Sequence, residues 1–231
     1  MPHRFIPKRA IALLAMLALA GVGARAADGP ASPVRIACIG DSITFGLGIM
    51  DPGDRYPAQL QILLGPGYVV KNFGHPGCTV TRDSFSGWPR GYAKQAEYAG
   101  ALEFQPDIVI CNLGINDVSD FAVPQHPAFV RDYLEIIAAF RSRSGTPRFI
   151  LWQPLAPLFP GHRYYQAPAV GQLNELIAQV AVQAGAETLD MHAPLAGHAE
   201  WVSSDHIHPN AQGARRIAEV TRDYLCAQPA R

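Results

Sequence analysis

The feature of this sequence that most constrains its fold is a repeated order: a short apolar run, a small polar motif, then a stretch with helical spacing. Three apolar runs are followed directly by polar motifs, at residues 40–42, 72–77 and 114–117. Strands that alternate with helices form a parallel sheet covered on both faces, with right-handed crossovers. The pattern therefore predicts an α/β fold built on a five-stranded parallel sheet.

The expected elements follow from the spacing of the apolar residues. Strands are expected in five short runs, at residues 34–39, 68–72, 107–113, 148–153 and 187–191. Helices are expected where apolar residues recur at every third or fourth position, at residues 56–64 and 92–104, around 129–140 and 173–180, and after 209. Because no internal repeat or linker interrupts this order, residues 27–231 are expected to form a single domain.

Polar residues gather where the expected strands end. The carboxyl ends of parallel strands lie at one edge of the sheet, and ligands of such folds bind there. The motifs place Ser42, Gly77 and Asn116 at this edge, while Asp205 and His208 precede the last expected helix. Acyl transfer needs a nucleophile, a base, a group that orients the base, and donors for an oxyanion. These residue types supply that set.

Taken alone, the Gly-Asp-Ser motif that ends at Ser42 has other interpretations. A strand followed by Gly40, Gly46 and Gly48 also suits a nucleotide-binding loop, but the spacing is neither GxGxxG nor GxxxxGK[ST]. It also differs from the GxSxG turn of α/β-hydrolases. The remaining alternative is that Ser42 caps a helix.

Asp205 and His208 stand three residues apart, just before a proline and a helix. A turn of this length brings a carboxylate against one ring nitrogen of the histidine and leaves the other nitrogen to face the serine. The alternative is a metal site made by Asp205, His206 and His208, with His192 or His198 as a further ligand. We expect no metal, because acidic ligands near these histidines are sparse.

Asn116 and Gly77 are the expected oxyanion donors. An asparagine side chain at a strand end can donate to a developing oxyanion, and a glycine offers its backbone amide at close range. The alternatives are an asparagine and a glycine that only form turns. For Asn72 and Asp117 we expect the turn-forming role.

Together the motifs resemble those of the SGNH, or GDSL-type, hydrolase superfamily, over nearly the whole chain after residue 26. The Gly-Asp-Ser, glycine, Gly-x-Asn-Asp and Asp-x-x-His-Pro blocks match at Ser42, Gly77, Asn116, Asp205 and His208. The resemblance implies that Ser42 is the nucleophile, that His208 is the base and that Asp205 orients it. It implies an oxyanion hole made by the Ser42 and Gly77 amides and the Asn116 side chain. It also implies a three-layer α/β/α, flavodoxin-like fold without metal or other cofactor.

Shorter stretches narrow the resemblance. Residues 36–46, 56–60, 72–74 and 106–109 are similar to bacterial carbohydrate esterases of the sialate O-acetylesterase and acetylxylan esterase types. The resemblance implies hydrolysis of acetyl esters, with O-acetylated carbohydrates as substrates. The alternatives are a lipase or lysophospholipase of the same superfamily, which acts on longer acyl chains, and a glycan-binding module without turnover.

Four aromatic residues are the candidate platforms for the alcohol part of a glycan ester: Trp88, Tyr164, Tyr165 and Trp201. All four lie in expected loops, where aromatic rings offer large flat contact areas with polar edges. The alternative for each is a small loop core.

The first 26 residues have the pattern of a secretory signal peptide. Basic residues precede an apolar run at 11–22, and Ala24-Arg25-Ala26 forms a small-x-small cleavage site. The apolar run is shorter than the roughly 20 residues of a membrane span, although an uncleaved anchor is the alternative. We expect a periplasmic or secreted protein without stable membrane insertion after cleavage. Cleavage removes four basic residues and no acidic one, so the formal charge changes from 0 to −4, which argues against a nucleic-acid partner.

Overall fold

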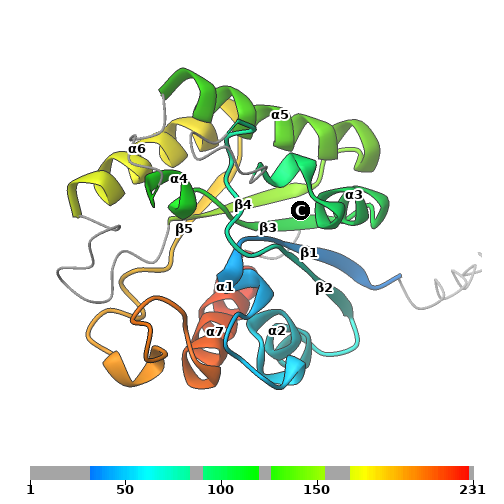
Figure 1. Ribbon diagram of the computed structural model, residues 1–231. Coiled ribbons are helices and arrows are strands. Elements are labelled where there is room, and N and C mark those ends of the chain that lie inside the picture. The colour runs from blue at the N-terminus through cyan, green and yellow to red at the C-terminus, as the bar shows by residue number, and fades with distance from the viewer. Residues whose placement is uncertain (1–31, 84–90, 120–125, 154–166, 229–231) are drawn as a thin grey trace, which may run out of the picture. The chain divides into compact units, whose positions relative to one another are not determined.

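The computed structural model describes residues 32–83, 91–119, 126–153 and 167–228 (Figure 1). The expected signal peptide at residues 1–26 lies outside this part of the chain. Within it, no helix combines the length and the apolar character that crossing a membrane requires.

One sheet of five parallel strands forms the centre of the fold, in the order β2-β1-β3-β4-β5. The strands are β1 Val34–Gly40, β2 Tyr68–Gly74, β3 Ile108–Asn112, β4 Arg148–Gln153 and β5 Glu187–Asp190. Each lies within two residues of the expected run at both ends, which confirms the predicted α/β fold with a five-stranded parallel sheet. The strand order is the flavodoxin-like one.

Helices cover both faces of the sheet, which gives three layers (Figure 1). Successive side chains of β1 point to opposite faces: Ala37 and Ile39 join one buried cluster, and Ile36 and Cys38 join the other. The first cluster is completed by α3 (Ala96–Glu103), α5 (His126–Ser144) and α6 (Ala167–Ala184), and the second by α2 (Tyr56–Leu64) and α7 (Ala211–Ala227). Burial on both faces explains why the three inner strands, β1, β3 and β4, read as nearly continuous apolar runs.

The last helix illustrates how the sequence specifies its packing. The side chain of Asn210 caps α7 by accepting hydrogen bonds from the amides of Gln212 and Gly213. The residues of α7 that recur at spacings of three and four are buried in the structure, namely Ala214, Ile217, Ala218, Thr221 and Leu225.

Three short features depart from the expected pattern. The helix expected at residues 92–104 is divided into a 3-10 turn, Tyr92–Lys94, and α3, because Gln95 has extended backbone angles (φ −91°, ψ 153°). Tyr92 is held by tertiary bonds, since its amide donates to the Thr79 carbonyl and its hydroxyl to the Phe73 carbonyl. These bonds outweigh local helix propensity. The short helices α1 (Ser42–Phe45) and α4 (Ile115–Ser119) were not expected from periodicity.

Small residues at the strand ends let α1 rest on the edge of the sheet. Gly40 pairs with both Gly74 and Asn112, so that β1, β2 and β3 end at one level. A Cβ atom on Gly74 would collide with the backbone of Phe45, and one on Gly40 would collide with the Thr44 side chain. Glycine at these two positions therefore allows the helix that begins at Ser42 to pack directly against the strands.

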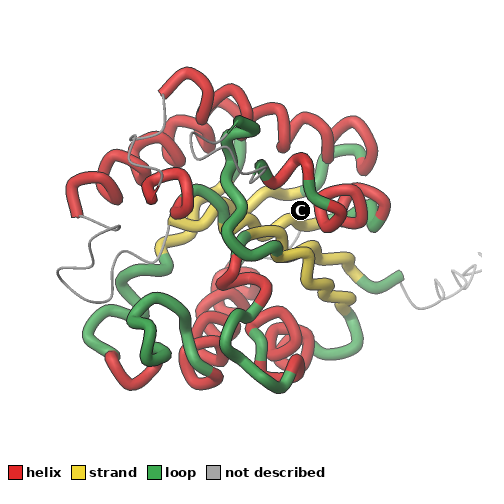
Figure 2. Tube along the Cα trace, in the orientation of Figure 1, coloured by secondary structure: helices red, strands yellow, loops and turns green. Residues whose placement is uncertain are grey.

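The polar motif at residues 205–209, which contains Asp205 and His208, lies in the long connection between β5 and α7. Figure 2 shows this connection as loop, interrupted by the 3-10 turn Ala199–Trp201. A further 3-10 turn, Pro52–Asp54, lies between α1 and α2. The four cysteines, Cys38, Cys78, Cys111 and Cys226, are free in the structure, and the first three are buried.

Candidate active site

Ser42 is the first residue of α1, directly after the turn at the end of β1. The helix cap is Asp41, whose carboxylate accepts a hydrogen bond of 2.9 Å from the Ile43 amide. The interpretation of Ser42 as a helix cap is therefore wrong, and its hydroxyl is available for another partner.

The turn before α7 brings Asp205 and His208 together. One carboxylate oxygen of Asp205 accepts hydrogen bonds from the amides of Ile207 and His208, both at 2.9 Å. The turn is closed by the Ser203 amide, which donates to the His208 carbonyl at 2.8 Å. His206, in the middle, has a left-handed backbone (φ 61°), a conformation that non-glycine residues adopt at an energetic cost.

The second carboxylate oxygen of Asp205 lies 2.6 Å from His208 Nδ1, and His208 Nε2 lies 2.8 Å from Ser42 Oγ. The histidine side chain is 13% exposed and that of the aspartate 46%. Partial burial acts to raise the pKa of Asp205, but the hydrogen bonds from the His208 amide and ring outweigh it, and the pKa lies below its ordinary value. Asp205 is thus a carboxylate at neutral pH, suited to orient the imidazole.

The expected oxyanion donors come from the turn after β2 and from α4. Gly77 follows β2 with a left-handed backbone (φ 73°), and Asn116 lies in α4. The Asn116 Nδ2 atom donates to the Cys78 carbonyl at 3.0 Å and lies 3.5 Å from a carboxylate oxygen of Asp41. Asn116 therefore contacts both Cys78, which follows Gly77, and Asp41, which precedes Ser42.

The carboxyl groups of Asp41 and Asp117 are buried in the structure, which the sequence pattern did not predict. Burial raises the pKa of Asp41 to about 7, against the lowering effect of the Ile43 amide, and the charge of Asp117 adds to the rise. Burial likewise raises the pKa of Asp117 to about 6, although amide and hydroxyl groups of Val80 and Thr81 donate to it. Asp117 fixes the turn after β2, as expected.

Of the four aromatic residues expected to contact the sugar, the structure describes one. Trp201 is half-buried beside the turn, its carbonyl accepts from the Asn210 amide at 2.9 Å, and its ring stacks on His198 at 3.6 Å. Trp88, Tyr164 and Tyr165 lie outside the described residues.

The alternative metal site has little support in the geometry. His208 is hydrogen-bonded to Ser42 and Asp205, while His198 pairs with Glu200 at 2.7 Å. In the described part of the chain, no group of three or more His, Cys, Asp or Glu side chains is arranged to hold a metal ion.

The structure is thus an α/β protein in which a serine, a histidine and an aspartate are hydrogen-bonded to one another at the edge of the sheet where the strands end. Residues 38–216 match the GDSL-like Lipase/Acylhydrolase family, and the chain belongs to this family. The resemblance inferred from the four motifs is confirmed.

One relative and two solved structures of similar fold illustrate the similarity. An acetylxylan esterase of Xylanibacter ruminicola is 32% identical over 205 residues, which cover 81% of this chain and 42% of the relative. The chain therefore spans less than half of that protein. The crystal structure of the acetyl xylan esterase AlAXEase is similar in fold, with a TM-score of 0.65, 19% identity, and coverage of 83% of this chain and 100% of that one. Est24, a carbohydrate acetylesterase from Sinorhizobium meliloti, has a TM-score of 0.60, 20% identity, and coverage of 84% and 99%.

Proposed function

We propose that this protein is a carboxylic ester hydrolase with Ser42 as its nucleophile, His208 as its base and Asp205 as the residue that orients the base. The observation that carries the proposal is the continuous chain of hydrogen bonds from Asp205 Oδ2 through the His208 ring to Ser42 Oγ, at 2.6 and 2.8 Å. Membership in a family of lipases and acylhydrolases supports the same chemistry.

The reaction proceeds in two halves. Ser42 Oγ attacks the ester carbonyl while His208 Nε2 takes the hydroxyl proton, which gives a tetrahedral intermediate. The intermediate collapses as His208 returns the proton to the leaving alcohol, and the acyl group remains on Ser42. Water, deprotonated by His208, then attacks the acyl-serine and releases the acid and the free serine. Asp205 stabilises the charged imidazole in both halves.

The negative oxygen of each tetrahedral intermediate is bound by the backbone amides of Ser42 and Gly77 and by the side-chain amide of Asn116. Donors fixed before the reaction are effective because they need no reorganisation when the charge develops. The contacts of Asn116 Nδ2 with the Cys78 carbonyl and the Asp41 carboxylate place this side chain between the neighbours of Gly77 and Ser42.

For the substrate, we propose short acyl esters, acetyl above all, on carbohydrates. The support is the 32% identity to an acetylxylan esterase and the similarity in sequence and fold to proteins of that description. Trp201 is the candidate contact for the sugar, and its position next to the turn of Asp205 and His208 favours this. We further propose that residues 1–26 direct export to the periplasm or outside the cell. Ala27 as the first residue of the mature protein would support this, and a retained Met1 would contradict it.

The test is a comparison of kcat/KM across nitrophenyl esters of two to twelve carbons, with acetate release from acetylated xylan and O-acetyl sialic acid. The proposal predicts the highest kcat/KM for the acetyl ester and acetate release from at least one glycan, both abolished in Ser42→Ala. A maximum at eight carbons or more, without acetate from any glycan, would instead indicate a lipase or lysophospholipase. Glycan binding with no turnover of any ester would indicate a binding module.

A further inference from the structure

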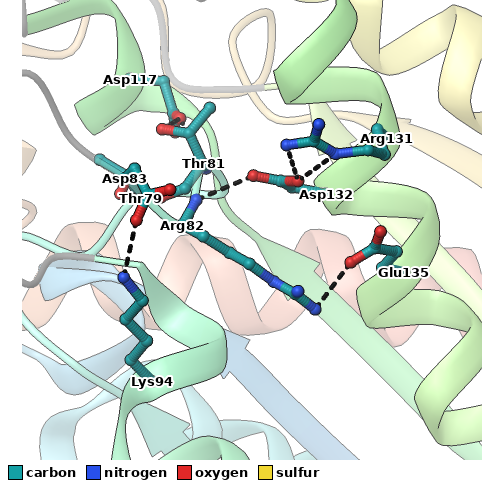
Figure 3. A network of polar contacts seen from close by, with 9 residues as sticks. All are labelled: Thr79, Thr81, Arg82, Asp83, Lys94, Asp117, Arg131, Asp132 and Glu135. Atoms are coloured by element: carbon teal, nitrogen blue, oxygen red, sulfur yellow. Dashed lines mark hydrogen bonds and ion pairs between the residues drawn. The ribbon is translucent and has the colours of Figure 1, made fainter.

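The loop that follows Gly77 is hydrogen-bonded to the buried carboxylate of Asp117 in α4. One oxygen of Asp117 accepts from the Val80 amide at 2.9 Å, and the other accepts from the Thr81 amide at 3.0 Å and the Thr81 hydroxyl at 2.8 Å. Figure 3 shows the Asp117 side chain beside Thr81. Asp117 is 3% exposed, so these bonds are shielded from water. Asp117 therefore holds Val80 and Thr81, while its chain neighbour Asn116 holds Cys78.

The far end of the same loop is attached to α5. Asp132, 2% exposed, accepts from the Arg82 amide at 2.9 Å, and the Arg82 side chain pairs with Glu135 at 2.7 Å (Figure 3). Asp83 at the outer end pairs with Lys94 at 2.9 Å. The attachments at Arg82 and Asp83 begin five residues after Gly77, whereas those of Asp117 begin three residues after it.

Gly77 is open on the side where a side chain would stand. Among the described residues, no atom outside its immediate chain neighbours lies within 4 Å of the place where a Cβ would be, and its backbone is left-handed. Its amide is therefore located by the bonds on either side of it. Before it, the His75 amide donates to the Gly40 carbonyl at 2.9 Å, and after it come the bonds to Asn116 and Asp117.

We propose that Asp117 is a positioning residue for the oxyanion site, and that its bonds to Val80 and Thr81 set the separation between the Gly77 amide and the Asn116 side chain. This inference rests on the proposed ester hydrolase function. A buried carboxylate is costly to a fold, and its three donors here lie on one loop, next to a donor of the site. An apolar residue would fill the same space without orienting that loop.

The expected effect follows from the sensitivity of catalysis to distance. A displacement of a reacting or stabilising group by about 1 Å lowers the rate by about a hundredfold. Asp117→Asn keeps the shape of the side chain but turns an amide donor toward one of the loop donors, so the loop must move. We expect kcat for nitrophenyl acetate to fall by roughly tenfold to a hundredfold, with KM changed by less than about twofold, because the oxyanion forms after substrate binding.

The experiment compares Asp117→Asn with the matched variant Asp132→Asn, which alters a buried carboxylate holding the same loop at Arg82. Each is measured for kcat, KM and thermal unfolding, and Asp117→Asn is repeated in the Asn116→Ala background. The inference predicts that Asp132→Asn loses thermal stability but little kcat. It also predicts that the kcat loss of Asp117→Asn shrinks once Asn116 is absent, because both act through one site.

A second pair of variants tests the same bond if Asp117→Asn does not fold. Thr81→Val removes the hydroxyl bond to Asp117 and is expected to lower kcat roughly threefold, while Thr81→Ser retains the hydroxyl and the kcat. Equal kcat in all variants, or losses in proportion to thermal stability alone, would overturn the inference and leave the proposed function intact. Absence of nitrophenyl acetate hydrolysis by the unaltered protein would overturn the proposed function, and the inference with it.

Discussion

The buried carboxyl of Asp41 should make the stability of this protein depend on pH. Its pKa is about 7 in the folded protein against an ordinary 3.8, because burial disfavours the ionised form. The stabilising contribution of the neutral form is therefore complete below about pH 4 and is lost as the pH rises through 7. A shift of about three units at about 1.4 kcal/mol each gives a loss of roughly 4 kcal/mol between these limits.

Asp41→Asn removes the titration but keeps the shape of the side chain and an acceptor for the Ile43 amide. The free energy of unfolding of Asp41→Asn minus that of the unaltered protein should become more positive by roughly 4 kcal/mol between pH 4 and pH 8, because only the unaltered protein loses stability over this range. Urea denaturation followed by circular dichroism at half-unit pH intervals measures this difference directly. Asp54→Asn, which alters an exposed carboxylate, is the matched control and should give a curve parallel to that of the unaltered protein. A parallel curve for Asp41→Asn as well would refute the reasoning that burial of Asp41 outweighs the hydrogen bonds that the carboxylate accepts.

Three further predictions concern the site. Asn116→Ala should lower kcat by about 10²–10³, or roughly 2.7–4 kcal/mol, with a smaller change in KM, since the bond to the oxyanion forms in the transition state; a change in KM alone would contradict this. Asp205→Asn should lower kcat by roughly 10³–10⁴, because the amide holds the imidazole in the wrong tautomer. A kcat within tenfold of that of the unaltered protein, measured by steady-state kinetics, would remove Asp205 from the mechanism. Activity should survive exhaustive dialysis against EDTA, whereas loss that zinc or another divalent ion restores would favour a metal site at Asp205, His206 and His208.

The strands and the edge at which the site lies could be read from the sequence, because buried parallel strands are continuous apolar runs. The apolar runs of β1, β3 and β4 are followed by polar motifs or loops, so the carboxyl ends of these strands could be predicted. Helices with a long apolar stripe were equally clear, as in α7. Ser42 and Asn116 lie within four residues of the ends of β1 and β3, and His208 lies three residues before α7.

The parts that the sequence did not reveal depend on contacts distant in the chain. The short helices α1 and α4 have too few turns to show a period, and Gln95 is extended because Tyr92 is anchored to Thr79 and Phe73. The burial of Asp41 and the bonds that Asp117 makes to Thr81 likewise require the packed sheet, since no local pattern distinguishes a buried carboxylate from a turn aspartate.

The hydroxyl of Ser42 is the atom on which the proposed function depends, and covalent labelling tests it most directly. A serine-reactive phosphonate ester, followed by peptide mass spectrometry, should modify Ser42 in step with the loss of nitrophenyl acetate hydrolysis. Ser42→Ala should fold with an unchanged thermal midpoint, take up no phosphonate and lose at least roughly a thousandfold in kcat. Labelling at another residue, or a Ser42→Ala protein that still hydrolyses the ester at a substantial rate, would contradict the proposal that Ser42 is the nucleophile.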